Sequence, residues 1–209
     1  SLNHFSLHTE NTTDEILPSG QKLQFGDAVD VFVQRPDRLQ AKVKGDIRNQ
    51  ELFYDGKTIT LFNHEENLYA SLNAPPTIEK ALDYAIESFG LAAPLADIIY
   101  RNVYDILTED VTSGIYVGLH YVHGVQCHHL AFTRDDIDWQ IWIENSQTPL
   151  PRKVIITEKW ITGSPQFTAL LSNWNLSPKF DDNLFRFVPP EKAKKIDFLP
   201  TIKSLPTEK

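Results

Sequence analysis

Apolar and polar residues alternate with a period of two along most of this chain. In the stretch HFSLHTE at residues 4–10, Phe5 and Leu7 point to one side and the polar residues between them point to the other. Such alternation is typical of strands with one buried and one solvated face. Ten further stretches continue it, at residues 30–34, 38–44, 51–54, 57–62, 66–73, 114–122, 126–132, 138–144, 151–160 and 166–176. We therefore predict a mainly β (α+β) protein whose antiparallel sheet has about eleven strands.

Only residues 75–107 change to a helical period. Their apolar residues recur at three- and four-residue spacing, as Ile78, Ala81, Leu82, Ala85, Ile86 and Phe89. Thr77 is placed to cap this helix, and Gly90 is placed to end it. Pro94 is placed to open a second helix that carries Leu95, Ile98, Ile99 and Val103. We expect both helices to cover one face of the sheet.

No repeat or linker divides the sequence, so residues 1–209 are predicted to form one domain, with a peripheral tail at residues 190–209. A single-layer sheet must cover its apolar face, and two short helices are little material for eleven strands. We therefore expect a cavity between sheet and helices. Its lining is predicted to include Phe25, Phe32, Phe53, Leu61, Tyr69, Leu82, Ile86, Leu119, Leu130, Phe132, Trp139 and Ile141, each of which is equally compatible with an ordinary packed core.

The stretch HYVHGVQCHH at residues 120–129 holds four histidines and the only cysteine. A two-residue turn at Gly124-Val125 would pair His120 with His129 and place both on one face with Cys127. Three such side chains can bind zinc, so a metal-dependent protein or a hydrolase is the alternative function. Without a carboxylate to orient the histidines, and with two of the residues parallel on one strand, a plain hairpin is the interpretation we favour.

The amino-acid composition argues against several classes of function. The net charge of −8 and the isoelectric point near 5.3 argue against binding to nucleic acid or to an anionic membrane surface. One cysteine excludes an internal disulfide, and no apolar run approaches the roughly 20 residues that span a bilayer. The signatures of a nucleophilic serine, a phosphate loop or a zinc protease are missing from the sequence. We expect a protein that is not an enzyme and needs no cofactor or metal.

Three stretches share their order and spacing with one protein family. They are VDVFVQRPDRLQAKV at 29–43, LFYDGKTITLFNHEENLYA at 52–70 and FTALLSNWNLSPKFDDNLFRFVPP at 167–190. Together they resemble LolA-like periplasmic lipoprotein carriers. The stretches APPTIEKALDYA, CHHLAF, DWQIWI and PLPRKVIIT are most similar to an uncharacterised family of predicted exported bacterial proteins within that superfamily.

This resemblance implies a half-open barrel, in which a strongly curved sheet encloses an apolar cavity beneath lid helices. By its place in the motif, Arg35 matches the arginine that ties sheet to lid, although a surface arginine before a turn is an equal alternative. The implied function is non-enzymatic binding of a lipid or a lipoprotein acyl chain, as a periplasmic carrier or chaperone. A further alternative is a structural module whose cavity its own side chains fill. The chain has no methionine, which indicates a processed or trimmed start. The resemblance implies an exported, periplasmic protein whose signal peptide was removed.

Overall fold

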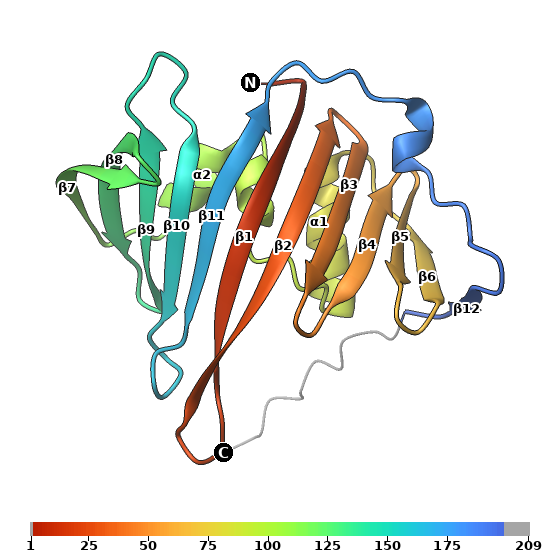
Figure 1. Ribbon diagram of the computed structural model, residues 1–209, viewed down its shortest axis with the longest axis horizontal. Helices are drawn as coiled ribbons and strands as arrows, with labels where there is room; N and C mark the ends of the chain where they lie inside the picture. The colour runs from red at the N-terminus through yellow and green to blue at the C-terminus, as the bar shows by residue number, and fades with distance from the viewer. Residues whose placement is uncertain (1, 199–209) are drawn as a thin grey trace.

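The computed structural model describes residues 2–198, which form a single twelve-stranded, curved sheet with the helices of residues 78–108 on one of its faces (Figure 1). The strands are β1 (His4–Ile16), β2 (Lys22–Gln34), β3 (Arg38–Gly45), β4 (Asn49–Tyr54), β5 (Thr58–Asn63), β6 (Leu68–Asn73), β7 (Ser113–Val122), β8 (Val125–Thr133), β9 (Ile137–Glu144), β10 (Pro151–Glu158), β11 (Gln166–Asn175) and β12 (Lys194–Ile196). Their order is β12-β6-β5-β4-β3-β2-β1-β11-β10-β9-β8-β7, and only β12 and β6 run parallel.

The eleven predicted strands are all present, and the mainly antiparallel sheet is confirmed. Its two edges, β12 and β7, are not paired with each other, so the sheet is not closed into a barrel. The twelfth strand was not predicted and comes from the tail, where Lys194–Ile196 pairs with Leu68–Ala70. The rest of that tail, residues 199–209, lies outside the described residues, and the division into one domain and a peripheral tail stays a prediction.

The strand register separates an apolar inner face, which lies toward the helices, from an outer face. Residues that pair across neighbouring strands form rows on the inner face. One such row is Phe5, Val33, Leu39, Tyr54 and Ile59. All five side chains are almost fully buried and belong to the main hydrophobic core. The core therefore sits between the inner face and the helical segment, as a one-sided sheet requires.

The first helix follows its sequence signals closely. Helix α1 spans Ile78–Phe89, the Thr77 hydroxyl accepts a hydrogen bond from the Lys80 amide at 3.5 Å, and Gly90 ends the helix in the left-handed region with φ of 66°. Its buried residues are Ile78, Ala81, Leu82 and Ala85. The predicted cap, end and apolar face of this helix are confirmed.

The predicted second helix is instead broken in two. A 3₁₀ helix, η1, covers Ala96–Ile99, and a short helix, α2, covers Val103–Thr108. Between them Tyr100 has extended backbone dihedrals of −74° and 153°. The reason is tertiary, because the Ile99 carbonyl accepts a hydrogen bond from Arg35 and the buried Tyr100 hydroxyl donates one to Asp83 at 2.8 Å. These contacts replace those of a continuous helix.

Tyr54 fixes the approach to helix α1, and its removal provides a test of the fold. The side chain is 1% exposed, and its hydroxyl donates a hydrogen bond of 2.7 Å to the Pro75 carbonyl. We expect Tyr54→Phe to lower the free energy of unfolding by about 1 kcal/mol, because the partly buried hydrogen bond to the Pro75 carbonyl is lost. Chemical denaturation measures this. Tyr104→Phe is the control, since Tyr104 is 75% exposed, and an equal loss in both variants would contradict the assignment.

Candidate ligand-binding site

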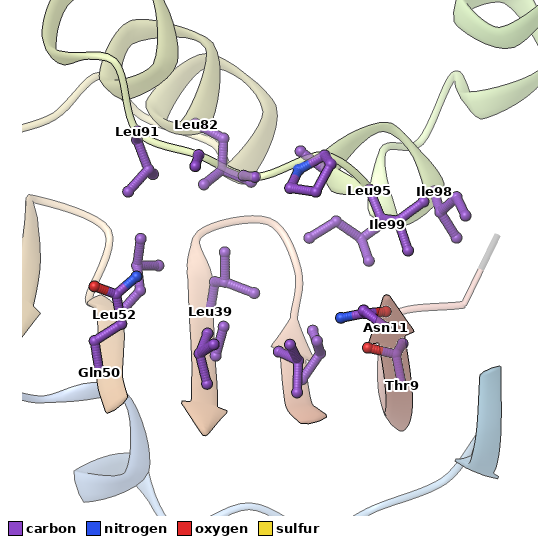
Figure 2. Close-up of a pocket in the computed structure, with 18 of the residues that line it drawn as sticks. Thr9, Asn11, Leu39, Gln50, Leu52, Leu82, Leu91, Leu95, Ile98 and Ile99 are labelled. Atoms are coloured by element: carbon purple, nitrogen blue, oxygen red, sulfur yellow. The ribbon is translucent and has the colours of Figure 1, made fainter. Parts of the chain in front are cut away.

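An apolar cavity of about 140 Å³ lies between the first strands and the segment that links α1 to η1. We call it the first cavity. Figure 2 shows Leu82, Leu91 and Leu95 of the helical segment facing Leu39 and Leu52 of the sheet across it. Since one water-sized group needs roughly 10–15 Å³ on this scale, the space corresponds to a short run of chain carbons rather than a single atom.

A second cavity of about 500 Å³ lies beneath α2, on the other half of the sheet. Its walls come from β8 and β9 on one side and from Tyr104 and Leu107 of α2 on the other. Phe132 and Trp139 stack in its floor with ring centroids 4.2 Å apart. Ile98 of η1 lines both cavities, so one short segment separates two apolar spaces on the same face.

Arg35 lies where the sheet meets this segment, and its side chain is 5% exposed. One guanidinium nitrogen donates to the Glu79 carboxylate of α1 at 2.9 Å, and another donates to the Ile99 carbonyl of η1. A third, Nε, donates to the Leu2 carbonyl at 3.1 Å. A single side chain from the end of β2 thus holds both helical elements.

The Tyr100 hydroxyl adds a neutral contact at the same place. Burial, together with the hydrogen bond to Asp83, raises the pKa of Tyr100 well above the ordinary value of 10. The hydroxyl therefore stays protonated and keeps donating to the Asp83 carboxylate of α1. With Arg35, it gives the α1–η1 unit two anchors of different chemistry.

Half of the residues predicted to line a cavity do so. Leu61 and Leu82 line the first cavity. Leu130, Phe132, Trp139 and Ile141 line the second. Any role of these six residues in binding stays a prediction, as does a role of Arg35 in opening and closing the cover.

The structure places three predicted lining residues on the outer face instead, where the segment after β11 covers them. Phe32 packs edge-on against Phe180 at 6.1 Å between ring centroids. Phe53 and Tyr69 pack against Phe187 at 5.4 and 5.0 Å. The alternation of apolar and polar residues distinguishes the two faces of a strand but does not show which face the helices cover. The predicted cavity lining therefore included aromatic residues of the outer face.

The remaining three candidates lie away from both cavity linings. Leu119 is 45% exposed on the edge strand β7. Ile86 packs against the core from the far part of α1, and Phe25 lies on β2 beyond the cavity, opposite Thr13. Leu91, Ala92 and Ala93 of the linker also line the first cavity, and they were not predicted because the sequence carries no periodic pattern there.

The histidine hairpin forms with a different turn from the predicted one. Val122 pairs with Val125, and the turn residues are His123 and Gly124, with φ of 46° and 81°. Two consecutive residues with positive φ are typical of the turn that matches strand twist. His120 therefore pairs with Cys127 and not with His129, which corrects the predicted register.

His120, Cys127 and His129 nevertheless share the outer face, away from both cavities. The Nδ1 atoms of the two histidines lie 3.0 Å apart, and His129 stacks on Trp142 at 3.9 Å between ring centroids. Cys127 is fully buried, and burial raises the pKa of its thiol. Within residues 2–198 no group of three His, Cys, Asp or Glu side chains is placed to hold a metal ion. The geometry gives the metal-dependent alternative no support.

One family model matches residues 1–199, and its description is "Predicted periplasmic protein (DUF2092)". The chain belongs to this family. The predicted relationship to an uncharacterised family of exported proteins is confirmed, and so is the periplasmic location. In the part of this DUF2092 member that the structure describes, no helix is long and apolar enough to cross a membrane. No curated protein matches it.

Several solved structures resemble this DUF2092 member at low sequence identity. An uncharacterized conserved protein from Thermus thermophilus is 8% identical, with a TM-score of 0.52 over 91% of this chain and 90% of the other. LprF from Mycobacterium bovis is 15% identical, with a TM-score of 0.48 over 85% and 88%. A LolA superfamily protein from Nitrosomonas europaea is 12% identical, with a TM-score of 0.42 over 89% and 91%. The first of these shares the fold of this chain.

From the burial of His129 beside His120, we predict that the stability of the folded protein depends on pH. Burial lowers the pKa of His129 below its ordinary value of 6.5, and neighbouring His120 acts in the same direction. The His129 imidazole therefore binds a proton more readily in the unfolded chain than in the folded protein. The stability contributed by the neutral His129 side chain is complete above pH 6.5 and is lost as the pH falls below it. Thermal unfolding of wild type and His129→Gln between about pH 7.5 and 5 measures the effect.

We expect the variant to lose less stability over this range than the wild type does. His128→Gln, on the opposite face of the same strand, is the control. The prediction fails if wild type and His129→Gln show the same pH dependence.

Proposed function

We propose that this protein binds a hydrophobic ligand, the acyl chain of a lipid or of a lipoprotein, between its sheet and its helical segment. The observation that carries the proposal is the pair of apolar cavities on the inner face, roofed only by α1, η1, α2 and the loops between them among the described residues. Burying an acyl chain there stabilises the complex by roughly 0.8 kcal/mol per methylene. The role is non-enzymatic, that of a periplasmic carrier or chaperone.

The arrangement of the roof supports reversible binding. Apart from α1, the roof consists of a 3₁₀ turn of four residues, a helix of six residues and the loops around them. None of these elements is long enough to be stable alone, so their position depends on contacts with the sheet. In the proposed mechanism, the half-open barrel admits a ligand when the roof moves and the Arg35 contacts are broken.

The periplasmic family and the LolA-like sequence resemblance are consistent with this role. A carrier must shield acyl chains from water between two membranes, and a cavity that opens by displacement of short helices meets that requirement. The structural alternative, in which side chains alone fill the space, predicts that added lipid will neither bind nor raise the melting temperature.

Filling the first cavity tests the proposal directly. Ala41 lines this cavity from β3, so Ala41→Phe would occupy space left for the ligand. Excluding about two methylenes costs about 1.6 kcal/mol, so the lipid recovered with purified protein should fall roughly tenfold or more. Native and denaturing mass spectrometry measure the bound lipid.

Ala28→Phe is the matched control, because Ala28 lies on the outer face of the neighbouring strand. It should leave bound lipid unchanged. Absence of any lipid on the wild type, with no gain in melting temperature on adding lauroyl lipids, would refute the proposed function.

The Arg35 contacts generate a separate prediction. In Arg35→Gln, α1 and η1 lose their charged anchor, and Glu79 loses its partner. We expect a loss of about 1.5–3 kcal/mol in the free energy of unfolding, because hydrogen bonds to charged groups have that magnitude. We also expect faster ligand release and faster amide exchange at residues 96–101.

Arg152→Gln is the control for this experiment, since Arg152 binds Glu144 within the sheet, away from the helical segment. If both variants released lipid at the wild-type rate, Arg35 would be a structural residue without a role in opening.

A further inference from the structure

The lining of the first cavity changes from apolar to polar along the strands. The row Leu7, Val31, Ala41, Leu52 and Leu61 is entirely apolar. In the next row, Val29 and Val43 are flanked by Thr9 on β1 and Gln50 on β4 (Figure 2). The row after that begins with Asn11 and Asp27. We call Thr9, Asn11, Asp27, Arg48 and Gln50 the polar end.

An ion pair crosses this polar end. The Arg48 side chain, from the loop between β3 and β4, donates to one Asp27 carboxylate oxygen. The other Asp27 oxygen accepts a hydrogen bond of 2.7 Å from the Asn11 amide. Both carboxylate oxygens are thus engaged, and the positive charge of Arg48 is balanced. Among the described residues, Arg48 is the only charged residue that lines this cavity; its partner Asp27 lies just behind the lining, and the pair as a whole is electrically neutral.

Unused hydrogen-bonding capacity remains there. The side-chain oxygen of Asn11 is buried and has no partner among the described residues. A buried acceptor without a donor is costly, and a ligand hydroxyl or amide that reaches this oxygen removes the cost. Gln50 and Thr9 supply further donors and acceptors in the next row.

We infer that the ligand of the first cavity is an amphiphile with one inserted acyl chain and an uncharged head group, such as an acylglycerol, whose hydroxyls meet the polar end. This inference rests on the proposed function and names its ligand class. A phosphate or carboxylate head group at Arg48 would lie beside the Asp27 carboxylate, whose repulsion offsets much of the attraction to the guanidinium.

The test compares lipids that differ only in the head group. Full-length, delipidated protein is loaded with a fluorescent hydrocarbon probe, which is then displaced by lauroylglycerol, lauroyl lysophosphatidylglycerol or laurate. We expect lauroylglycerol to bind roughly tenfold more tightly than either anion, a difference of about 1.4 kcal/mol. Displacement by none of the three would refute the proposed function itself. Equal displacement by all three would refute only the inference about the head group.

Asp27→Asn is the decisive variant. It frees Arg48 from its counter-charge, so the preference should shift toward lauroyl lysophosphatidylglycerol by roughly tenfold. Asp14→Asn is the matched control, because Asp14 pairs with Lys22 on the same two strands but, unlike Asp27, hydrogen-bonds to no described residue that lines the cavity. An unchanged preference in a folded Asp27→Asn protein would overturn the inference.

Gln50→Leu provides a test that does not depend on the ion pair. This half-buried side chain should tolerate replacement. We expect weaker lauroylglycerol binding and unchanged affinity for the hydrocarbon probe, which has no head group to lose contacts. A parallel loss of both affinities would show that the variant damages the cavity, and would contradict a head-group role for the polar end.

Discussion

Only a short segment of the chain shields the inner face of the sheet from water, and the rest of the structure depends on this constraint. Eleven antiparallel strands expose one continuous apolar surface, and a single segment between β6 and β7 covers it. Only α1 within that segment is long enough to bury a full helical face. The shorter elements are held by contacts to the sheet, above all those of Arg35. Two apolar cavities remain where this cover is incomplete.

A different part of the chain covers the outer face of the sheet. After β11, an aromatic-rich segment crosses it and places Phe180 and Phe187 on strand aromatics. Phe185 in the 3₁₀ helix η2 (Asp182–Phe185) is 1% exposed. The pocket beside β1 and β2 is lined largely by polar and charged groups, whereas both apolar cavities lie on the helical side. Candidate ligand chemistry is therefore concentrated on the helical side.

Two ion pairs lie inside the molecule. Arg35 and Arg48 are each partly or largely buried, and each is paired with one carboxylate, Glu79 or Asp27. The first pair joins sheet to cover, and the second closes one end of the first cavity. The balance of charge in the second pair is the basis for the uncharged head group that we infer for the ligand of the first cavity.

The sequence by itself determined the eleven strands, the helix with its cap and end, and the position of Arg35 before a turn, because these depend on local periodicity and local backbone preferences. It did not determine which strand face the helices cover, so Phe32, Phe53 and Tyr69 were expected in the cavity. It also did not reveal that Tyr100 interrupts the second helix or that His123 joins the hairpin turn. The tertiary structure decided these points, since each depends on contacts between residues far apart in the chain or on the pairing of two strands.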